Sequence, residues 1–229
     1  MRVRRKKKGI GFFKVLLLIV VLIAGAVIAR QYLPWKHYAD MEHGWKLILV
    51  NKDNYIPKDY KVKLLTLSNG KKVDARIYPK LQEMFDAARA SGINLHVAEG
   101  YRSEEEQEDM MEEKIESFIE EGKSEGEAKK LARKWVALPG TSEHQLGIAV
   151  DINSQISTPS GPLYSWLANN SYKYGFILRY PPNKVSITGV KYEPWHFRYV
   201  GKSAAAQIHR QGIDRKSTRL NSSHNQRSR

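Results

Sequence analysis

The sequence predicts a single α+β domain with a small antiparallel sheet and flanking helices, preceded by one transmembrane helix. Strand-like and helix-like segments are mixed without strict alternation, which is typical of α+β rather than α/β domains. A long apolar run stands near the N-terminus. The chain contains no cysteine, so an exported domain without disulfides must be held together by its core or by a metal.

The N-terminal segment resembles a membrane anchor. Residues 1–9 are basic, and residues 10–29 are mostly apolar. At about 1.5 Å per residue, that apolar run spans roughly 30 Å, the thickness of the hydrocarbon core of a bilayer. The basic cluster predicts a single-pass protein of the cell membrane with its start in the cytoplasm and its domain outside. The small residues Ala24-Gly25-Ala26 leave a cleaved signal peptide as the alternative.

The remaining chain divides into a juxtamembrane linker (30–44), a domain (45–213) and a tail (214–229). The tail lacks hydrophobic periodicity and resembles the translation of a sequencing-adapter oligonucleotide, so we expect it to be non-native or disordered. The net charge of +14 is concentrated at the ends, with +7 in residues 1–14 and +4 in the tail, leaving +3 between them. This balance does not predict a basic groove, and we expect no nucleic-acid partner.

Local patterns predict the elements of the domain in order. The run WKLILVN (45–51) indicates a short strand. Apolar residues at helical spacing follow and predict a helix that stops at Gly92. The apolar residues that recur at this spacing are Leu81, Met84, Phe85 and Ala88. Alternating apolar residues at 93–97 predict the next strand.

Two capping boxes predict two further helices. Ser103 to Glu106 opens a helix that ends at about Glu121, and Ser124 to Glu127 opens one that ends at about Val136. Residues 162–175 indicate another helix, with Leu163, Trp166 and Leu167 facing inward. The final runs FILRY, VSITGV and WHFRYV predict strands separated by turns.

The segment GTSEHQLGIAVDI places His144 seven residues before Asp151. Residues an odd number apart face opposite ways in a straight strand, so the two side chains converge only if the chain bends. Gly147 is the natural bend. Asp151 then lies among apolar neighbours, where an unpaired carboxylate is costly, so it needs a cation.

The segment YEPWHFRYV supplies Glu193 and His196. Pro194 disfavours helix before it, and the following aromatic residues favour a strand with His196 and Arg198 on one face. The two segments together hold two histidines, one aspartate and one glutamate. Two neutral imidazoles and one carboxylate form the ligand set of a catalytic zinc, whose fourth position stays open for water.

Together with EGYRS (99–103), these segments resemble the zinc D-alanyl-D-alanine carboxypeptidases of the VanY type over roughly residues 45–201. The resemblance is carried by Tyr101-Arg102-Ser103, Gln107, Ser142-x-His144-x-x-Gly147-x-x-x-Asp151 and Glu193-x-Trp195-His196. It implies that Zn²⁺ is held by His144, Asp151 and His196. It also implies that Glu193 is the general base, that Arg102 stabilises the oxyanion, and that Ser142 and Gln107 contact the substrate.

Several alternatives remain open. Glu143 lies next to a predicted ligand and is a second candidate for the base, Arg102 could instead pair with Glu99 or a helix-cap carboxylate, and Ser142 could be a plain turn residue. The expected reaction removes the C-terminal D-alanine from peptidoglycan stem peptides. The rivals are an L,D-carboxypeptidase acting on tetrapeptide stems and a non-catalytic zinc-bearing cell-wall binding module. Glu193 speaks against the binding module, because a structural zinc site needs no base.

Overall fold

The computed structural model describes residues 15–21, 36–154 and 160–211, with the chain divided into two compact units, 1–37 and 38–229. In the first unit, residues 15–21 are helical. Most of the predicted membrane span (10–29) lies outside the described residues, as does the whole predicted tail (214–229). No helix within the described ranges is long and apolar enough to cross a membrane.

The second unit is α+β, as predicted. Its strands are β1 (Leu64–Thr66), β2 (Lys72–Asp74), β3 (Leu95–Glu99), β4 (Ala149–Ser154), β5 (Phe176–Leu178) and β6 (His196–Tyr199). Its α-helices are α2 (Tyr78–Ala90), α3 (Glu104–Glu120), α4 (Glu125–Ala132), α5 (Ser160–Asn170), α6 (Val185–Thr188) and α7 (Lys202–Gln211). Short 3₁₀ helices are η1 (Glu143–Leu146), η2 (Ser171–Tyr174) and η3 (Pro182–Lys184).

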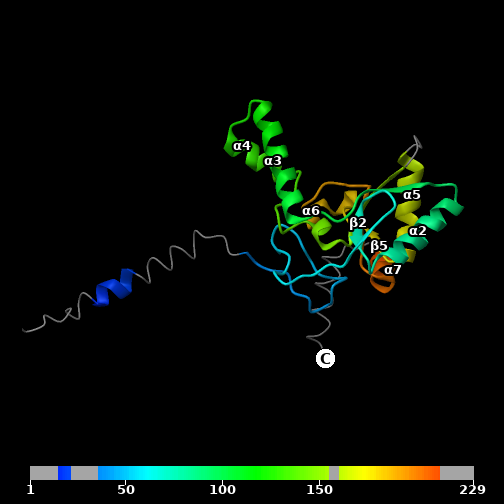
Figure 1. Ribbon diagram of the computed structural model, residues 1–229, viewed down its shortest axis with the longest axis horizontal. Helices are drawn as coiled ribbons and strands as arrows, with labels where there is room; N and C mark the ends of the chain where they lie inside the picture. The colour runs from blue at the N-terminus through cyan, green and yellow to red at the C-terminus, as the bar shows by residue number, and fades with distance from the viewer. Residues whose placement is uncertain (1–14, 22–35, 155–159, 212–229) are drawn as a thin grey trace, which may run out of the picture. The chain divides into compact units, whose positions relative to one another are not determined.

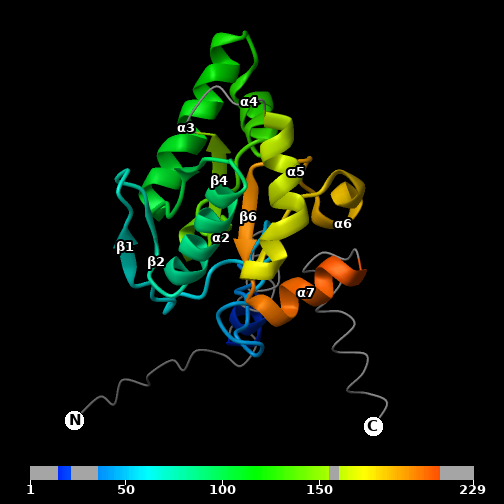
Figure 2. The same ribbon diagram turned by 90° about the vertical axis from the view of Figure 1, so that its right-hand side faces the viewer.

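The central sheet is antiparallel and has the strand order β3-β4-β6-β5. A separate antiparallel hairpin is formed by β1 and β2. Helices α2 and α5 lie across one face of the central sheet (Figure 2). Helices α3 and α4 pack on each other as a helical hairpin (Figure 1).

Strand alternation gives the central sheet one apolar and one polar face. In β4 and β6, Val150, Ile152 and Phe197 are fully buried in the main core beneath the helices. The residues between them point to the other face, where Asp151 pairs directly with His196. A register shift in β3 between Val97 and Glu99 sets Glu99 opposite Asp151. The extra residue turns Glu99 towards the polar face.

Local signals predicted the C-terminal ends of helices α2 and α3 to within two residues, whereas the helix predicted over 162–175 is α5 followed by the 3₁₀ helix η2. Helix α2 buries Leu81, Met84 and Ala88 as expected. Ser103 caps α3 through the predicted capping box, and Gly122 follows the helix end with a positive φ of 84°. Helix α4 is shorter than predicted and ends at Ala132 instead of Val136.

Two strand predictions are wrong. Residues 45–51 form turns and an isolated bridge, although Ile48, Leu49 and Val50 are buried. The carbonyl groups of Lys46 and Ile48 accept hydrogen bonds from the Arg198 guanidinium instead of from a neighbouring strand.

The segment VSITGV was also predicted as a strand, but residues 185–188 form the single-turn helix α6. The Thr188 hydroxyl bonds back to the Lys184 carbonyl, and Gly189 ends the turn with a φ of 74°. β-branched residues favour a strand only when a neighbouring strand offers a surface to pack against. β5 and β6 pair with each other, and neither pairs with this segment.

Candidate active site

The structure brings together the three side chains predicted to bind zinc. Asp151 Oδ1 lies 3.5 Å from His144 Nε2 and 3.0 Å from His196 Nδ1. One ligand atom from each residue lies within 4.8 Å of the others. A tetrahedral zinc at about 2.1 Å from each ligand would set ligand atoms about 3.4 Å apart. Asp151 Oδ1 is also buried without a hydrogen-bond partner within the described chain. The donor set and the geometry therefore fit Zn²⁺.

His144 is oriented by the chain bend that the sequence predicted. It lies in η1, and Gly147 ends that turn in the left-handed region with a φ of 69°. An added Cβ at Gly147 would lie only 3.1 Å from the backbone nitrogen of Asp74, so the bend is packed tightly against β2. His144 Nδ1 lies 2.8 Å from the carbonyl oxygen of Gly100. A proton on Nδ1 would satisfy that carbonyl and leave the Nε2 lone pair free for a metal ion beside Asp151.

His196 faces the same aspartate through Nδ1, whereas His144 faces it through Nε2. His196 Nδ1 points to Asp151, and its Nε2 lies 3.7 Å from Glu143 Oε2. Burial alone would lower the pKa of His196, but the carboxylates of Asp151 and Glu143 raise it to about 9 in the metal-free protein. For Asp151, burial alone would raise the pKa, but the two imidazoles lower it far below its usual range. The zinc-free site therefore holds a proton that a cation would replace.

Glu193 borders the predicted metal position. Its Oε2 lies 3.8 Å from His196 Nδ1, and its side chain is 27% exposed. Burial raises the pKa of its carboxyl above the ordinary value. The backbone NH of Glu193 donates to the Tyr180 carbonyl, which fixes the loop that carries it. A partly accessible carboxylate beside the ligands suits a general base.

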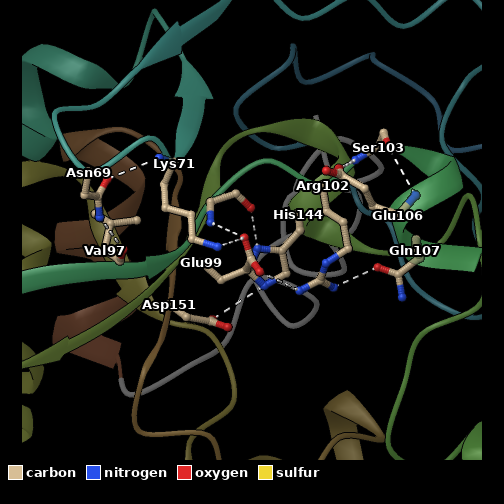
Figure 3. Close-up of polar contacts among 11 residues, drawn as sticks. Asn69, Lys71, Val97, Glu99, Arg102, Ser103, Glu106, Gln107, His144 and Asp151 are labelled. Carbon is tan, nitrogen blue, oxygen red and sulfur yellow. Dashed lines mark hydrogen bonds and ion pairs between the residues drawn. The ribbon is translucent and has the colours of Figure 1, made fainter. Parts of the chain in front are cut away.

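Arg102 points towards the site between two partners (Figure 3). Its Nη1 donates to Gln107 Oε1 at 2.9 Å, and its Nη2 lies 3.5 Å from Glu99 Oε2. The predicted alternative, an ion pair with Glu99, is therefore present. Gln107 is buried, and its Nε2 donates to the Ala137 carbonyl. The oxygen and the nitrogen of this side-chain amide therefore both form hydrogen bonds within the protein. This arrangement suits a role in holding Arg102 in place.

Ser142 and two buried arginines also lie near the predicted ligands. Ser142 is buried directly before η1 and does not cap that turn with its side chain. Sequence reasoning placed Arg198 on the face of His196 but gave no role to Arg198 or to Arg179, both buried beside Glu143. A weak signal existed for Arg198, which stands two residues after His196 in an otherwise aromatic strand.

Comparison with known proteins gives this geometry a context. The sequence model of the VanY family, described as D-alanyl-D-alanine carboxypeptidase, matches residues 70–202. A D-alanyl-D-alanine carboxypeptidase of Enterococcus faecalis is 54% identical over 173 residues, 75% of this chain and 65% of the relative. The chain thus spans less than two thirds of the length of that relative.

Solved structures agree in fold. One is the D,D-pentapeptidase VanY of a VanB-type vancomycin resistance cassette, a point mutant solved with Zn(II). It is 53% identical to this chain and has a TM-score of 0.72, and the match covers 76% of this chain and 98% of the solved chain. VanYB in complex with D-alanine-D-alanine is 53% identical with a TM-score of 0.73, covering 77% and 98%. The LD-carboxypeptidase LdcB is 34% identical with a TM-score of 0.63, covering 74% and 83%.

Proposed function

This chain belongs to the VanY family of D-alanyl-D-alanine carboxypeptidases, and we propose that it is a zinc-dependent carboxypeptidase that removes the C-terminal D-alanine from peptidoglycan stem peptides. The single observation that carries the proposal is the convergence of His144, Asp151 and His196 within 4.8 Å, with Glu193 beside them. The zinc ion and the D-alanine-D-alanine of the similar solved structures support the metal and the substrate.

His144 Nε2, Asp151 Oδ1 and His196 Nδ1 would hold the zinc ion. When bound there, zinc supplies a Lewis acid and lowers the pKa of a coordinated water to about 7. Glu193 takes a proton from the attacking water and later delivers it to the leaving amine of the terminal alanine. Its side chain is 27% exposed, so water and substrate can reach its carboxylate.

Arg102 provides positive charge for the developing oxyanion. Its side chain is 12% exposed and is held between Glu99 and Gln107, so the guanidinium is oriented before substrate arrives. Fixed charges in a water-poor site stabilise a transition state strongly because they need not reorganise. We assign Gln107 to positioning Arg102. Ser142, on the turn beside His144, would contact the terminal portion of the peptide.

The test is alanine release by the full-length chain. Pentapeptide and tetrapeptide stems are incubated separately, with and without a chelator, and release is followed by mass spectrometry. We expect zinc-dependent release from the pentapeptide. Release from the tetrapeptide alone would identify an L,D-carboxypeptidase, and binding to stem peptides without release would identify a binding module.

The base assignment is tested by Glu193→Gln. We expect a loss of kcat of about 10²- to 10⁴-fold with zinc still bound. Glu108→Gln, the same change at an exposed residue of α3, is the matched control and should keep full activity. Full activity in Glu193→Gln would exclude Glu193 as the base.

We also propose that residues 10–29 anchor the protein in the cell membrane with the domain facing the exterior. The length of the apolar run and the basic residues before it support this arrangement. Membrane fractionation and N-terminal sequencing of the native protein test it. A soluble product lacking residues 1–26 would instead identify a cleaved signal peptide.

A further inference from the structure

Glu143 follows the motif residue Ser142, and its side chain is almost fully buried. Its Oε1 accepts from Arg179 Nε at 2.9 Å and lies 2.7 Å from Arg198 Nη1. The side chains of Glu143, Arg179 and Arg198 are 1%, 3% and 0% exposed. Two guanidinium groups from β6 and the residue after β5 therefore hold one carboxylate in the interior beneath the polar face of the sheet.

The second oxygen of Glu143 faces a predicted zinc ligand. Oε2 lies 3.7 Å from His196 Nε2, and both atoms are buried without a hydrogen-bond partner within the described chain. A normal N–H···O hydrogen bond is about 2.7–3.2 Å long. A small movement of the imidazole towards Glu143 would close the gap, and an unmade bond between buried polar groups is costly.

We propose that Glu143 is a positioning residue for the metal site: its Oε2 accepts a hydrogen bond from the N–H of His196 Nε2 and thereby directs the Nδ1 lone pair at the metal. The inference rests on the zinc-dependent function proposed above. Metal-binding histidines generally donate their second ring N–H to a carboxylate, carbonyl or water, which fixes the tautomer and the ring orientation. Arg179 and Arg198 keep Glu143 in place for this role.

The two histidines are thus oriented through opposite nitrogens. His144 is held at Nδ1 by the Gly100 carbonyl and presents Nε2. His196 faces Glu143 with Nε2, 3.7 Å from Oε2, and presents Nδ1 to Asp151. The same contacts favour Glu193 over Glu143 as the base, because the side chain of Glu143 is 1% exposed and is paired with Arg179 and Arg198. The side chain of Glu193 is 27% exposed and is the more accessible of the two carboxylates.

The first experiment measures the zinc dissociation constant of the full-length chain by competition with a chromophoric chelator. We expect Glu143→Gln to raise the Kd about 10- to 100-fold, the usual effect of losing a partner of a metal-binding histidine. The matched control is Arg179→Gln, which breaks the same buried ion cluster but leaves Oε2 facing His196 and Arg198 still bound to Oε1. We expect it to lower the melting temperature while changing the zinc Kd less than about fivefold.

A second measurement needs no substitution and decides the matter if Glu143→Gln fails to fold. Long-range ¹H–¹⁵N NMR of the zinc-loaded chain should show His196 with its proton on Nε2 and the metal on Nδ1. A proton on Nδ1, or an equal change of zinc Kd in Glu143→Gln and Arg179→Gln, would overturn the proposal. Neither readout involves a substrate, so a failure of alanine release by the unsubstituted chain would count against the proposed reaction and not against this role of Glu143.

Discussion

Gly100→Ala tests how the backbone builds the metal site. A Cβ at this position would lie 2.2 Å from the carbonyl oxygen of Lys72 and 3.2 Å from its carbonyl carbon. Ordinary carbon contacts are about 3.5 Å long, so one segment must move by more than about 1 Å. Neither side yields easily, because the Lys72 oxygen belongs to β2 and also accepts the Tyr101 NH at 2.6 Å. The movement would carry the Gly100 carbonyl away from His144 Nδ1.

The expected cost follows from these contacts. Overpacking a tight interior costs about 1–3 kcal/mol. Weakening the bond from Tyr101 to Lys72 adds about 1 kcal/mol. The free energy of unfolding should therefore fall by about 2–4 kcal/mol, which corresponds to a loss of roughly 4–16 °C in melting temperature for a domain of this size. Zinc affinity should fall as well, because His144 loses the acceptor that orients its ring.

Gly126→Ala is the matched control for this assay. Gly126 lies inside α4 and has no atom within 4 Å of an added Cβ. Alanine is favoured over glycine in a helix by about 0.5–1 kcal/mol, so this variant should be slightly more stable. Thermal and urea denaturation of the three zinc-free proteins give the comparison. If Gly100→Ala melts within about 2 °C of the unsubstituted chain, the close packing of Gly100 against β2 does not constrain the site.

Three further predictions concern the cap of α3, the protonation of His196 and the hydrogen bond of Arg102. Ser103→Ala removes the side-chain cap of α3 and should cost about 1 kcal/mol in urea denaturation, and an unchanged midpoint would contradict it. Because the pKa of His196 in the zinc-free fold, about 9, exceeds its ordinary value of 6.5, its contribution to stability is complete below about pH 6.5 and is lost as pH rises through about 9. Urea titrations of the zinc-free protein should show that decline, the variant His196→Gln should lack it, and stability that rises over this range would refute the reasoning. Arg102→Lys keeps the positive charge but loses the planar guanidinium group that Gln107 holds. We therefore expect kcat to fall about 10²- to 10³-fold while the zinc Kd stays unchanged. A zinc Kd that changes in parallel would show a structural defect instead.

The sequence was most informative where local physics decides the outcome. The capping box at Ser103 and the bend at Gly147 depend on neighbouring residues, and both are present as predicted. The alternation that directs Asp151 and His196 to one face also depends only on strand periodicity. Those signals were enough to bring the predicted ligands together.

The wrong predictions concern segments whose structure depends on distant partners. The run at 45–51 has the composition of a strand, but its carbonyl groups bond to Arg198, about 150 residues later in the chain. Other long-range contacts were invisible in the sequence without making a prediction wrong: the amide of Gln107 joins Arg102 to the Ala137 carbonyl, and the predicted contact of Gln107 with substrate stays a prediction. Periodicity and spacing carry no information about such long-range contacts.

The cluster of Glu143, Arg179 and Arg198 is poorly explained by stability alone. Burying ions costs several kcal/mol each, and replacing a buried ion cluster with well-packed apolar residues is often neutral or stabilising. The cluster also leaves Oε2 of Glu143 without a hydrogen bond from either arginine. This oxygen faces Nε2 of the predicted zinc ligand His196, 3.7 Å away. Orientation of a metal ligand therefore accounts for a costly interior arrangement that a purely structural role leaves unexplained.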